Sequence, residues 1–399
     1  MTTSIGRSLI SAAAATLFAG AGQAGDRAPV QQDTQVLYTV THLPSLGGTS
    51  SLAGSINNRG WVAGRSNLPG NQSRHAVLWR SGVLTDLGTL GGPNSNIVWP
   101  VKNTSGLLAG ISQTAEPDPL GEAWSCSAFF PGATGRGYRC LGFAWQDGVM
   151  RALPTLGGTH GFATGANNRG EIVGWAENTV HDPTCVAPQV LQFRAVIWGP
   201  GEGAILELPP LPGDSVSAAT ALNDRGQVVG ISGICDDAVG KFSAIHAVLW
   251  QDGVPIDIGN IGGNAWNTSM AINHRGDIVG FANVSVTPNG EFNAHAFLRK
   301  AGEEMQDLGT LPLPGHVFSQ AYGINADGQV VGRSCDADFN CVAFLWQDGV
   351  MTELRTLVPG YTGVLTHAGD IDDTGRIVGQ AFDPVAGVFV AYVATPIEP

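Results

Sequence analysis

Residues 75–92 read HAVLWRSGVLTDLGTLGG, and related stretches begin at His246, His295 and Val342. Each stretch joins two short apolar segments through a polar turn. In the copies from His246 and Val342 the turn is Gln-Asp-Gly, and Asp-Gly between apolar segments is a strong signal for a tight β-hairpin. The repeated stretch therefore predicts two antiparallel strands, which we expect to be the third and fourth strands of a larger unit.

A second phrase precedes each copy, for example SINNRGWVAGRS from Ser55 and AINHRGDIVGFA from Ala271. Asn-x-x-Gly is typical of a turn, and the apolar residues on either side predict the first and second strands. The aligned turn residue recurs seven times, at intervals of 46 to 64 residues, and the positions are Asn57, Asn103, Asn167, Asn223, Asn273, Asn325 and Asp372. These intervals suit a four-stranded propeller blade, which is roughly 40–50 residues long.

The two ends of the chain complement each other. The last unit ends in VFVAYVATPIEP, from Val388, which supplies a third strand but no fourth. The early segment YTVTHLPSLGG, residues 38–48, resembles a fourth strand with no first three. Pairing them would remove two exposed sheet edges. We therefore predict an all-β, seven-bladed β-propeller with four-stranded blades, closed by the N-terminal strand; an open β-solenoid is the alternative.

The N-terminus, MTTSIGRSLISAAAATLFAGAGQAG, has the pattern of a signal peptide, which we place at residues 1–24. Residues 25–34 are expected to be a flexible lead-in, and residues 35–399 a single propeller domain. The predicted blades are residues 46–90, 91–156, 157–211, 212–261, 262–311, 312–357, and 358–399 together with 36–45. This organisation predicts a secreted protein, extracellular or periplasmic.

The composition agrees with many short strands and tight turns. Of 399 residues, 56 are Gly and 23 are Pro, while only 13% are charged. The net charge is −13, which would repel a nucleic-acid backbone, so nucleic acid is not an expected partner. No segment after the N-terminus is apolar for long enough to cross a membrane, and we expect a monomer.

The chain resembles the HAF-repeat family of bacterial extracellular proteins, through the motif at His295-Ala296-Phe297 and the phrases that surround it. The resemblance covers residues 36–399 and implies secretion and a repeated β fold, but no general catalytic activity. Several copies depart from the pattern. Leu141 and Arg194 stand where His is expected, and Arg299 replaces Trp.

The repeated residues themselves are expected to be architectural. His75, His246 and His295 share one position that other copies fill with Leu, Arg or Val, so we interpret them as hydrogen-bonding residues rather than catalytic ones. Trp occupies the end of the third strand in five copies and is expected to pack between blades. The Asn-x-x-Gly turns mostly carry Arg where a calcium loop needs an oxygen ligand, and neither a metal nor another cofactor is expected.

All six cysteines fall in or beside the variable connections between second and third strands. An even number in an exported chain suggests disulfides. Six cysteines allow 15 pairings. Our hypothesis pairs Cys126 with Cys140, Cys185 with Cys235, and Cys335 with Cys341. Such tied loops would identify a working face of the propeller.

On that face, the connections from each fourth strand to the next first strand carry the candidate ligand-binding residues Asn94, His160, Asp214, Trp266, His316 and Tyr361. Aromatic, amide, carboxylate and imidazole groups suit a glycan or a protein surface, so we predict a binding or scaffolding module. One alternative is a polysaccharide lyase or glycoside hydrolase, with His160, Asp214 and His316 as catalytic candidates and Asp236 or Asp237 completing a carboxylate pair with Asp214. A purely structural envelope or matrix component is the third possibility.

Overall fold

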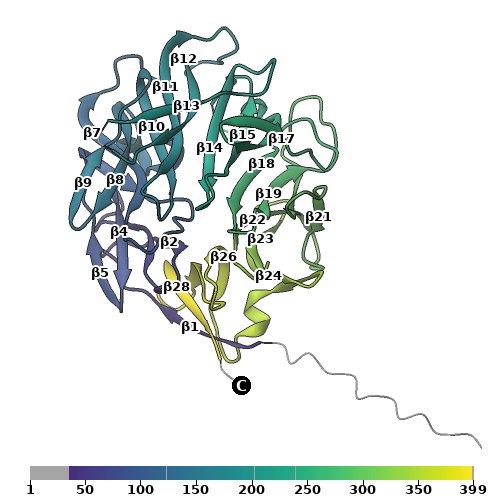
Figure 1. Cartoon of the computed structure of the whole chain (residues 1–399). Helices are drawn as coiled ribbons and strands as arrows, with labels where there is room; N and C mark the ends of the chain where they lie inside the picture. The colour runs from purple at the N-terminus through teal and green to yellow at the C-terminus, as the bar shows by residue number, and fades with distance from the viewer. Residues whose placement is uncertain (1–35, 123, 202, 239, 398–399) are drawn as a thin grey trace, which may run out of the picture. The chain divides into compact units, whose positions relative to one another are not determined.

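The computed structural model describes residues 36–122, 124–201, 203–238 and 240–397. Within these residues, seven four-stranded antiparallel sheets are arranged in a ring, as the blades of a seven-bladed β-propeller (Figure 1). The predicted fold class is confirmed, and the open solenoid is excluded. The predicted signal peptide and lead-in, residues 1–34, lie outside the described part of the chain.

In six of the sheets the strand order follows the chain from the axis outward, and in the closing sheet β1 is the outermost strand, beside β28. The innermost strands are β2 (Ser51–Ile56), β6 (Gly91–Asn96), β10 (Gly157–Ala166), β14 (Val216–Leu222), β18 (Thr268–Ile272), β22 (His316–Ile324) and β26 (Val364–Ile371). The second strands are β3 (Val62–Asn67), β7 (Leu108–Pro117), β11 (Ile172–His181), β15 (Val228–Gly233), β19 (Ile278–Asn283), β23 (Val330–Asp336) and β27 (Ile377–Asp383).

The outer half of each blade is shorter and more exposed. The third strands are β4 (Arg74–Arg80), β8 (Tyr138–Gln146), β12 (Leu191–Trp198), β16 (His246–Gln251), β20 (Ala294–Arg299), β24 (Cys341–Gln347) and β28 (Val388–Pro396). The outermost strands are β5 (Val83–Asp86), β9 (Val149–Ala152), β13 (Ile205–Leu208), β17 (Val254–Asp257), β21 (Gln306–Gly309), β25 (Val350–Glu353) and β1 (Tyr38–His42). Short helices are α1 (Trp124–Phe129), η1 (Gly132–Gly135), η2 (Phe242–Ala244) and η3 (Leu354–Leu357). None of the helices in the described residues is long and apolar enough to span a membrane.

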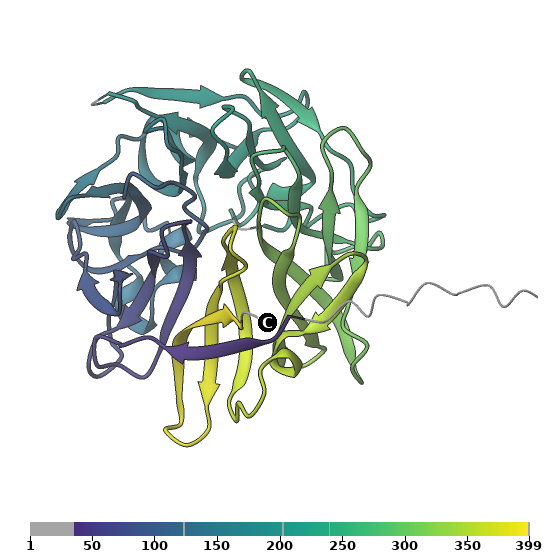
Figure 2. The same cartoon turned by 60° about the horizontal axis from the view of Figure 1, so that its bottom comes forward.

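The ring closes where the first strand meets the last. Strand β1 pairs antiparallel with β28, so that Tyr38 lies opposite Pro396 and His42 opposite Tyr392. The Leu43 N–H extends this pairing by donating to the Ala391 carbonyl at 2.8 Å. Figure 2 shows the purple N-terminal strand beside the yellow C-terminal strands. The predicted closure is therefore confirmed, and Tyr38 is buried within the core of the last blade.

The glycine that ends each WVAG- or VVG-type phrase is required by close packing of the two inner strands. A Cβ at this position would lie 1.8–2.2 Å from a carbonyl oxygen of the innermost strand, and the seven glycines are Gly64, Gly110, Gly174, Gly230, Gly280, Gly332 and Gly379. No side chain fits such an approach. Each of these glycines lies within the second strand of its blade.

The repeated Asn fastens neighbouring blades together. The Asn57 side-chain oxygen accepts hydrogen bonds from the N–H groups of Arg59 and Trp61, and so stabilises its own turn. Its amide nitrogen donates to the Asn103 carbonyl of the next blade at 2.8 Å. Equivalent bonds to the next blade are made, at 3.1–3.3 Å, by Asn103, Asn167, Asn223, Asn273 and Asn325.

The repeated Trp and His residues also serve the architecture. Trp79, Trp198 and Trp250 are buried between blades, and each indole N–H donates to a proline carbonyl at 2.7–2.8 Å. His75 lies 2.9 Å from Asp86, and His295 lies 3.0 Å from Asp307, so each imidazole links the third strand to the fourth. These contacts support a structural role for the Trp and His residues, and the absence of a catalytic role for the His residues stays a prediction.

Candidate functional site

The most prominent cavity is a funnel of about 810 Å³ around the ring axis. Ala128, Ala238 and Phe339 reach it from connections between second and third strands, and Trp266 reaches it from a connection between blades. The funnel thus opens on the face where the sequence varies most between repeats. A smaller cavity of about 140 Å³ lies at the turns that carry the repeated Asn residues, at the other end of the axis.

One position of the repeat, the residue directly after the close-packed glycine, contributes to the wall of the funnel in six of the seven blades. This position is occupied by Arg65, Ile111, Trp175, Ile231, Phe281, Arg333 and Gln380, and all except Ile111 line the cavity. Each pairs across the sheet with a residue of the innermost strand, as in Leu52–Arg65, Thr268–Phe281 and His367–Gln380. The constant glycine therefore positions a variable side chain at the same height in every blade.

One side of the funnel is apolar and aromatic. Trp99 makes edge-to-face contacts with Phe129, Phe162 and Trp175, with ring centroids 5.0–5.8 Å apart. Further round the ring, the Trp266 ring packs against Phe292 at 5.6 Å. Interlocked rings of this kind form a stiff surface that can receive a flat ligand.

The other side of the funnel is cationic and polar, and is formed by blades six, seven and one. Arg333 donates to the Gln320 side-chain oxygen from Nε at 2.9 Å and from Nη2 at 2.6 Å. The Tyr322 hydroxyl donates to the same oxygen at 2.6 Å, and its ring lies 4.5 Å from that of His367. Arg65 faces the funnel from blade one.

These charged groups are half-buried, and the described lining of the funnel offers them no carboxylate partner. Burial, together with repulsion from Arg74, lowers the pKa of Arg65 to about 9. Burial and the nearby charges of Arg333 and Arg65 hold the pKa of His367 well below its ordinary value, so its imidazole is neutral at pH 7. Among the described lining residues there is no Asp or Glu. The funnel is therefore locally positive in a chain whose net charge is −13.

Of the six ligand-binding residues predicted from the sequence, Trp266 lines the funnel. The other five are not on its lining, and each makes local contacts. Tyr361 contacts His42 at 2.9 Å, His316 contacts Ser334 at 2.9 Å, and Asp214 contacts His246 at 3.0 Å. The proposed carboxylate partner Asp236 accepts a hydrogen bond from the Phe242 N–H. A ligand-binding or catalytic role for these residues stays a prediction.

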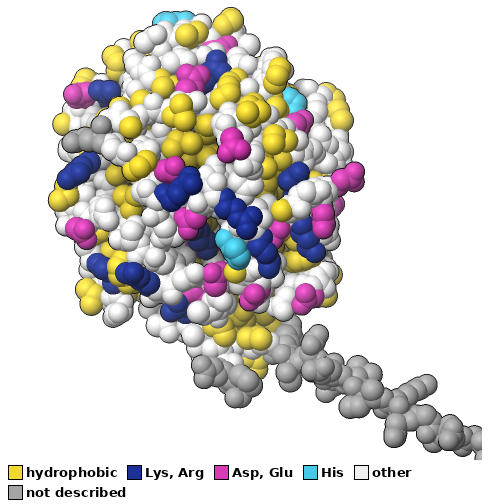
Figure 3. All heavy atoms as spheres, in the orientation of Figure 1, with side chains coloured by type: hydrophobic (Ala, Val, Ile, Leu, Met, Phe, Trp, Pro, Cys, Tyr) yellow, Lys and Arg dark blue, Asp and Glu magenta, His cyan; other side chains and the backbone are white. Residues whose placement is uncertain are grey.

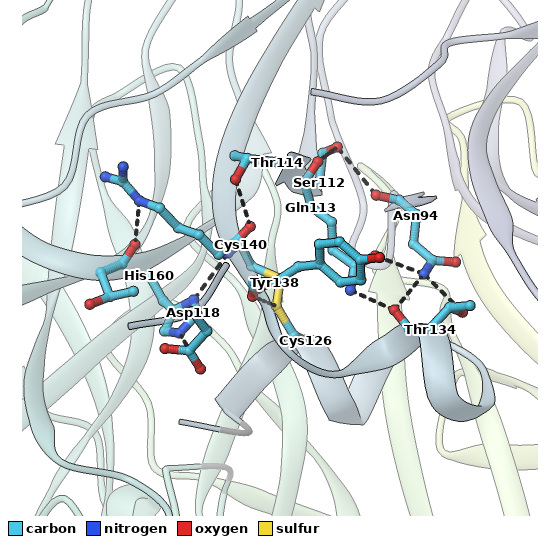
Figure 4. Close-up of a disulfide and its surroundings, with 12 residues drawn as sticks. Asn94, Ser112, Gln113, Thr114, Asp118, Cys126, Thr134, Tyr138, Cys140 and His160 are labelled. Carbon is cyan, nitrogen blue, oxygen red and sulfur yellow. Dashed lines mark hydrogen bonds and ion pairs between the residues drawn. A yellow bond between two sulfur atoms is a disulfide. The ribbon is translucent and has the colours of Figure 1, made fainter. Parts of the chain in front are cut away.

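Asn94 and His160 lie in the buried surroundings of the Cys126–Cys140 disulfide (Figure 4). Asn94 donates to the Gln113 side-chain oxygen at 2.8 Å. His160 Nδ1 accepts from the Cys140 N–H at 3.1 Å, and its Nε2 lies 3.5 Å from Asp118. These contacts brace the long connection of blade two.

His160, Asp118 and Glu122 lie close enough together to suggest metal ligands. The Cys140 N–H bond argues against this, since Nδ1 acts as an acceptor and the neutral imidazole then carries its proton on Nε2, the nitrogen that faces the acids. Nearby, burial and repulsion from Glu122 raise the pKa of Glu177 to about 7, against the opposing effect of His160. The cluster is best described as a buried, proton-sharing brace.

The three disulfides are those predicted from the sequence: Cys126–Cys140, Cys185–Cys235 and Cys335–Cys341. The second of these joins the loops of blades three and four, because Cys185 follows β11 and Cys235 follows β15. Bonds in these positions fix the rim of the funnel.

Strong single-sign patches are not evident on the surface seen in Figure 3, where Lys and Arg side chains are interspersed with Asp and Glu side chains.

No protein-family model and no curated protein matches the chain. Among solved structures it is similar to a Pyrococcus horikoshii acylaminoacyl peptidase, with a TM-score of 0.47 and 9% identity over 91% of this chain and 52% of that chain. It is also similar to a protein of unknown function from Dyadobacter fermentans, with a TM-score of 0.40 and 11% identity over 90% of this chain and 98% of that chain. The chain spans about half the length of the peptidase. The fold is that of a β-propeller, a general binding or scaffolding architecture.

Proposed function

We propose that this protein is an exported binding module, and that the end of a glycan enters the funnel on its loop-rich face. The observation that carries the proposal is the funnel itself. Its volume of about 810 Å³ lies in the range of ligand sites, roughly 300–1,000 Å³. Its lining of indole and phenyl rings offers flat apolar faces against which a sugar ring can stack.

The shape of the cavity favours a glycan end over a flat protein surface. A concave funnel buries a compact group on several sides, whereas a protein interface of standard size uses about 800 Å² on each partner. Polar side chains on blades six and seven, including Thr366 and Gln380, add hydrogen-bonding groups for hydroxyls. Export is supported by the N-terminal sequence pattern, by the three disulfides and by the resemblance to HAF-repeat proteins.

A glycoside hydrolase is supported less well. Hydrolysis of this kind uses a pair of carboxyl groups beside the scissile bond. The described lining of the funnel has no carboxylate, and Asp214 already contacts His246 and Ser232. A purely structural role would not account for an aromatic funnel whose rim is fixed by disulfides.

The proposal can be tested with a glycan array on the mature chain, followed by titration of the bound glycan with tryptophan fluorescence. Phe389→Ala removes a half-exposed ring from the funnel, and Leu206→Ala is a matched control on the outer strand β13. We expect Phe389→Ala to weaken binding about tenfold and Leu206→Ala to leave it unchanged. Equal effects of the two variants, or an array without any bound glycan, would contradict the proposal.

A further inference from the structure

We propose that Arg65 and Arg333 form a carboxylate-binding subsite, so that the ligand of the funnel is an acid whose ring lies against the aromatic side. This inference rests on the proposed function and specifies its ligand. The shared chemistry is a carboxylate attached to a ring, as in a uronic-acid residue at the end of a glycan or in a free aromatic acid.

The first support is the absence of an internal counter-charge. Within the described residues, neither Arg65 nor Arg333 forms an ion pair, although the chain carries 33 Asp and Glu residues against 20 Lys and Arg. Arg65 and Arg333 are both half-buried at the wall of the funnel, and drawing a guanidinium charge even partly out of water is costly unless the charge is paired. Two unpaired guanidinium groups that face the same cavity favour the binding of an anion there.

The second support is the hydrogen-bonding capacity that remains. A guanidinium has five N–H donors in a planar fork that matches a carboxylate. Arg333 uses two nitrogens on a single oxygen of Gln320, which holds the side chain in place and leaves Nη1 for a ligand. The Arg65 side chain donates no hydrogen bond to another residue in the described part of the chain. The first guanidinium is thus fixed and the second has its full set of donors.

The third support is the arrangement of the two residues in the ring. Arg333, Gln380 and Arg65 occupy the same repeat position in blades six, seven and one, which are consecutive around the closed ring. The four remaining blades place Ile or an aromatic residue there. A polar arc therefore faces an apolar arc at one height, which suits a ligand with an acid group at one end and a ring at the other.

His367 lies on the innermost strand of blade seven, between the blades that carry the arginines. Burial is the main cause of the lowered pKa of its imidazole, and the charges of Arg333 and Arg65 lower that pKa further. A neutral imidazole can donate one hydrogen bond to a ligand oxygen without adding a third positive charge. It completes the polar arc.

The test compares acids with neutral partners of the same shape. Benzoate is titrated against benzamide, and tri-galacturonate against its methyl ester, with quenching of tryptophan fluorescence as the readout, because Trp99, Trp175 and Trp266 line the funnel. We expect at least one acid to bind roughly 10- to 100-fold more tightly than its neutral partner, as charge-assisted hydrogen bonds would provide. Preference for tri-galacturonate identifies the glycan as the source, and preference for benzoate identifies a free aromatic acid.

The variants Arg65→Gln and Arg333→Gln are expected to reduce the affinity for the acid to that for its neutral partner. Arg151→Gln, an exposed arginine on the outer strand β9, is the matched control and should bind as the unmodified protein does. Arg333→Lys keeps the charge and is expected to keep part of the preference, which guards against a folding defect in the glutamine variant.

Neutral partners that bind as tightly as the acids, with both weakened by Phe389→Ala, would overturn the carboxylate subsite and leave the binding funnel intact. An acid preference that persists in both arginine variants would also overturn it. The absence of a saturable response to any of the four probes would also overturn the subsite, and the glycan array would then decide separately whether the funnel binds another glycan.

Discussion

The backbone N–H of Ile56 donates a hydrogen bond to the Asp370 carboxylate at 2.8 Å, and this bond joins the first blade to the last. Lys102, from the second blade, lies 2.5 Å from the same carboxylate and also donates to the Ile371 carbonyl at 2.6 Å. One fully buried acid thus connects three blades at the seam of the ring. The hydrogen bonds that the repeated Asn side chains donate from blade to blade, here called the Asn belt, are interrupted at this point, because the seventh copy carries Asp372 in place of Asn.

Asp370→Asn should weaken this seam. The variant keeps an oxygen for Ile56 but leaves the Lys102 charge without its partner, and breaking a buried ion pair in this way costs about 3 kcal/mol. We expect a corresponding decrease in the free energy of unfolding in urea. Asp373→Asn, an exposed acid at the same seam, should cost less than about 1 kcal/mol. Adding Lys102→Met to Asp370→Asn should restore part of the loss; equal stability of the two single variants would disprove this role.

Asn57→Ala removes two acceptor bonds within a turn and one donor bond to the next blade. At about 1 kcal/mol for each hydrogen bond, the expected loss is roughly 2–3 kcal/mol in the free energy of unfolding. The neighbouring Asn58 is exposed and contacts Asp373, so Asn58→Ala serves as the control and should cost about 1 kcal/mol or less. If Asn57→Ala lowered the free energy of unfolding no more than Asn58→Ala does, the Asn belt would contribute little to stability.

The disulfides should differ in their contribution to stability according to the chain they enclose. Cys185 and Cys235 are separated by 50 residues, and Cys335 and Cys341 by 6. Chain entropy predicts a loss of about 4 kcal/mol for Cys185→Ser with Cys235→Ser and about 2 kcal/mol for Cys335→Ser with Cys341→Ser. Urea unfolding of the two double variants measures the difference. A reversed order would show that strain in the folded loops outweighs chain entropy.

Stability should depend on pH through Glu177. Its folded pKa of about 7 lies above the ordinary value of 4.5, so the folded protein holds a proton that the unfolded chain has released between these values. Stability from this group is therefore complete below about pH 4.5 and is lost as the pH rises through 7. Its neighbour His160 has a raised pKa and acts in the same direction, while the pKa of Asp118 is lowered and acts at more acidic pH.

Glu177→Gln should flatten the decrease in the free energy of unfolding between pH 5 and pH 8 by about 1–3 kcal/mol. Urea titrations at four pH values measure the slope. Glu207→Gln, on the outer strand β13, should retain the slope of the unmodified protein. An unchanged slope in Glu177→Gln would place the titration elsewhere.

The sequence predicts the fold well because the repeat carries its own physical signals. Asn-x-x-Gly turns, close-packed glycines and Asp-Gly hairpins recur at blade-length intervals, and the strand-like ends reveal the closure. The pairing of Cys126 with Cys140 followed from their shared loop. Such signals are local, and in a propeller each blade contacts only its neighbours, so the order of the repeats along the chain gives the arrangement of the blades.

The site is harder to predict from the sequence because its charged residues lie on strands and not on the variable loops. Trp266 was found there, but Arg65 and Arg333 lie on second strands, where position is read from register and not from loop length. A signal for them does exist in the sequence. The residue after the constant glycine is Arg in two copies and Ile, Trp, Phe or Gln in the others, which is variation at a position surrounded by constancy. The position lines the axis only once the ring is closed, and that relationship is not local.

Because the seventh sheet combines β1 from the N-terminal part of the chain with β26, β27 and β28 from the C-terminal part, it is the last to be completed during synthesis. Six sheets can form in turn as the ribosome releases them, while Tyr38–His42 waits for a partner made some 350 residues later. A premature stop before β28, or proteolysis that removes β1, would leave the seventh sheet incomplete. The pairing of β1 with β28 therefore closes the ring, and it can form only after β28 has been synthesised.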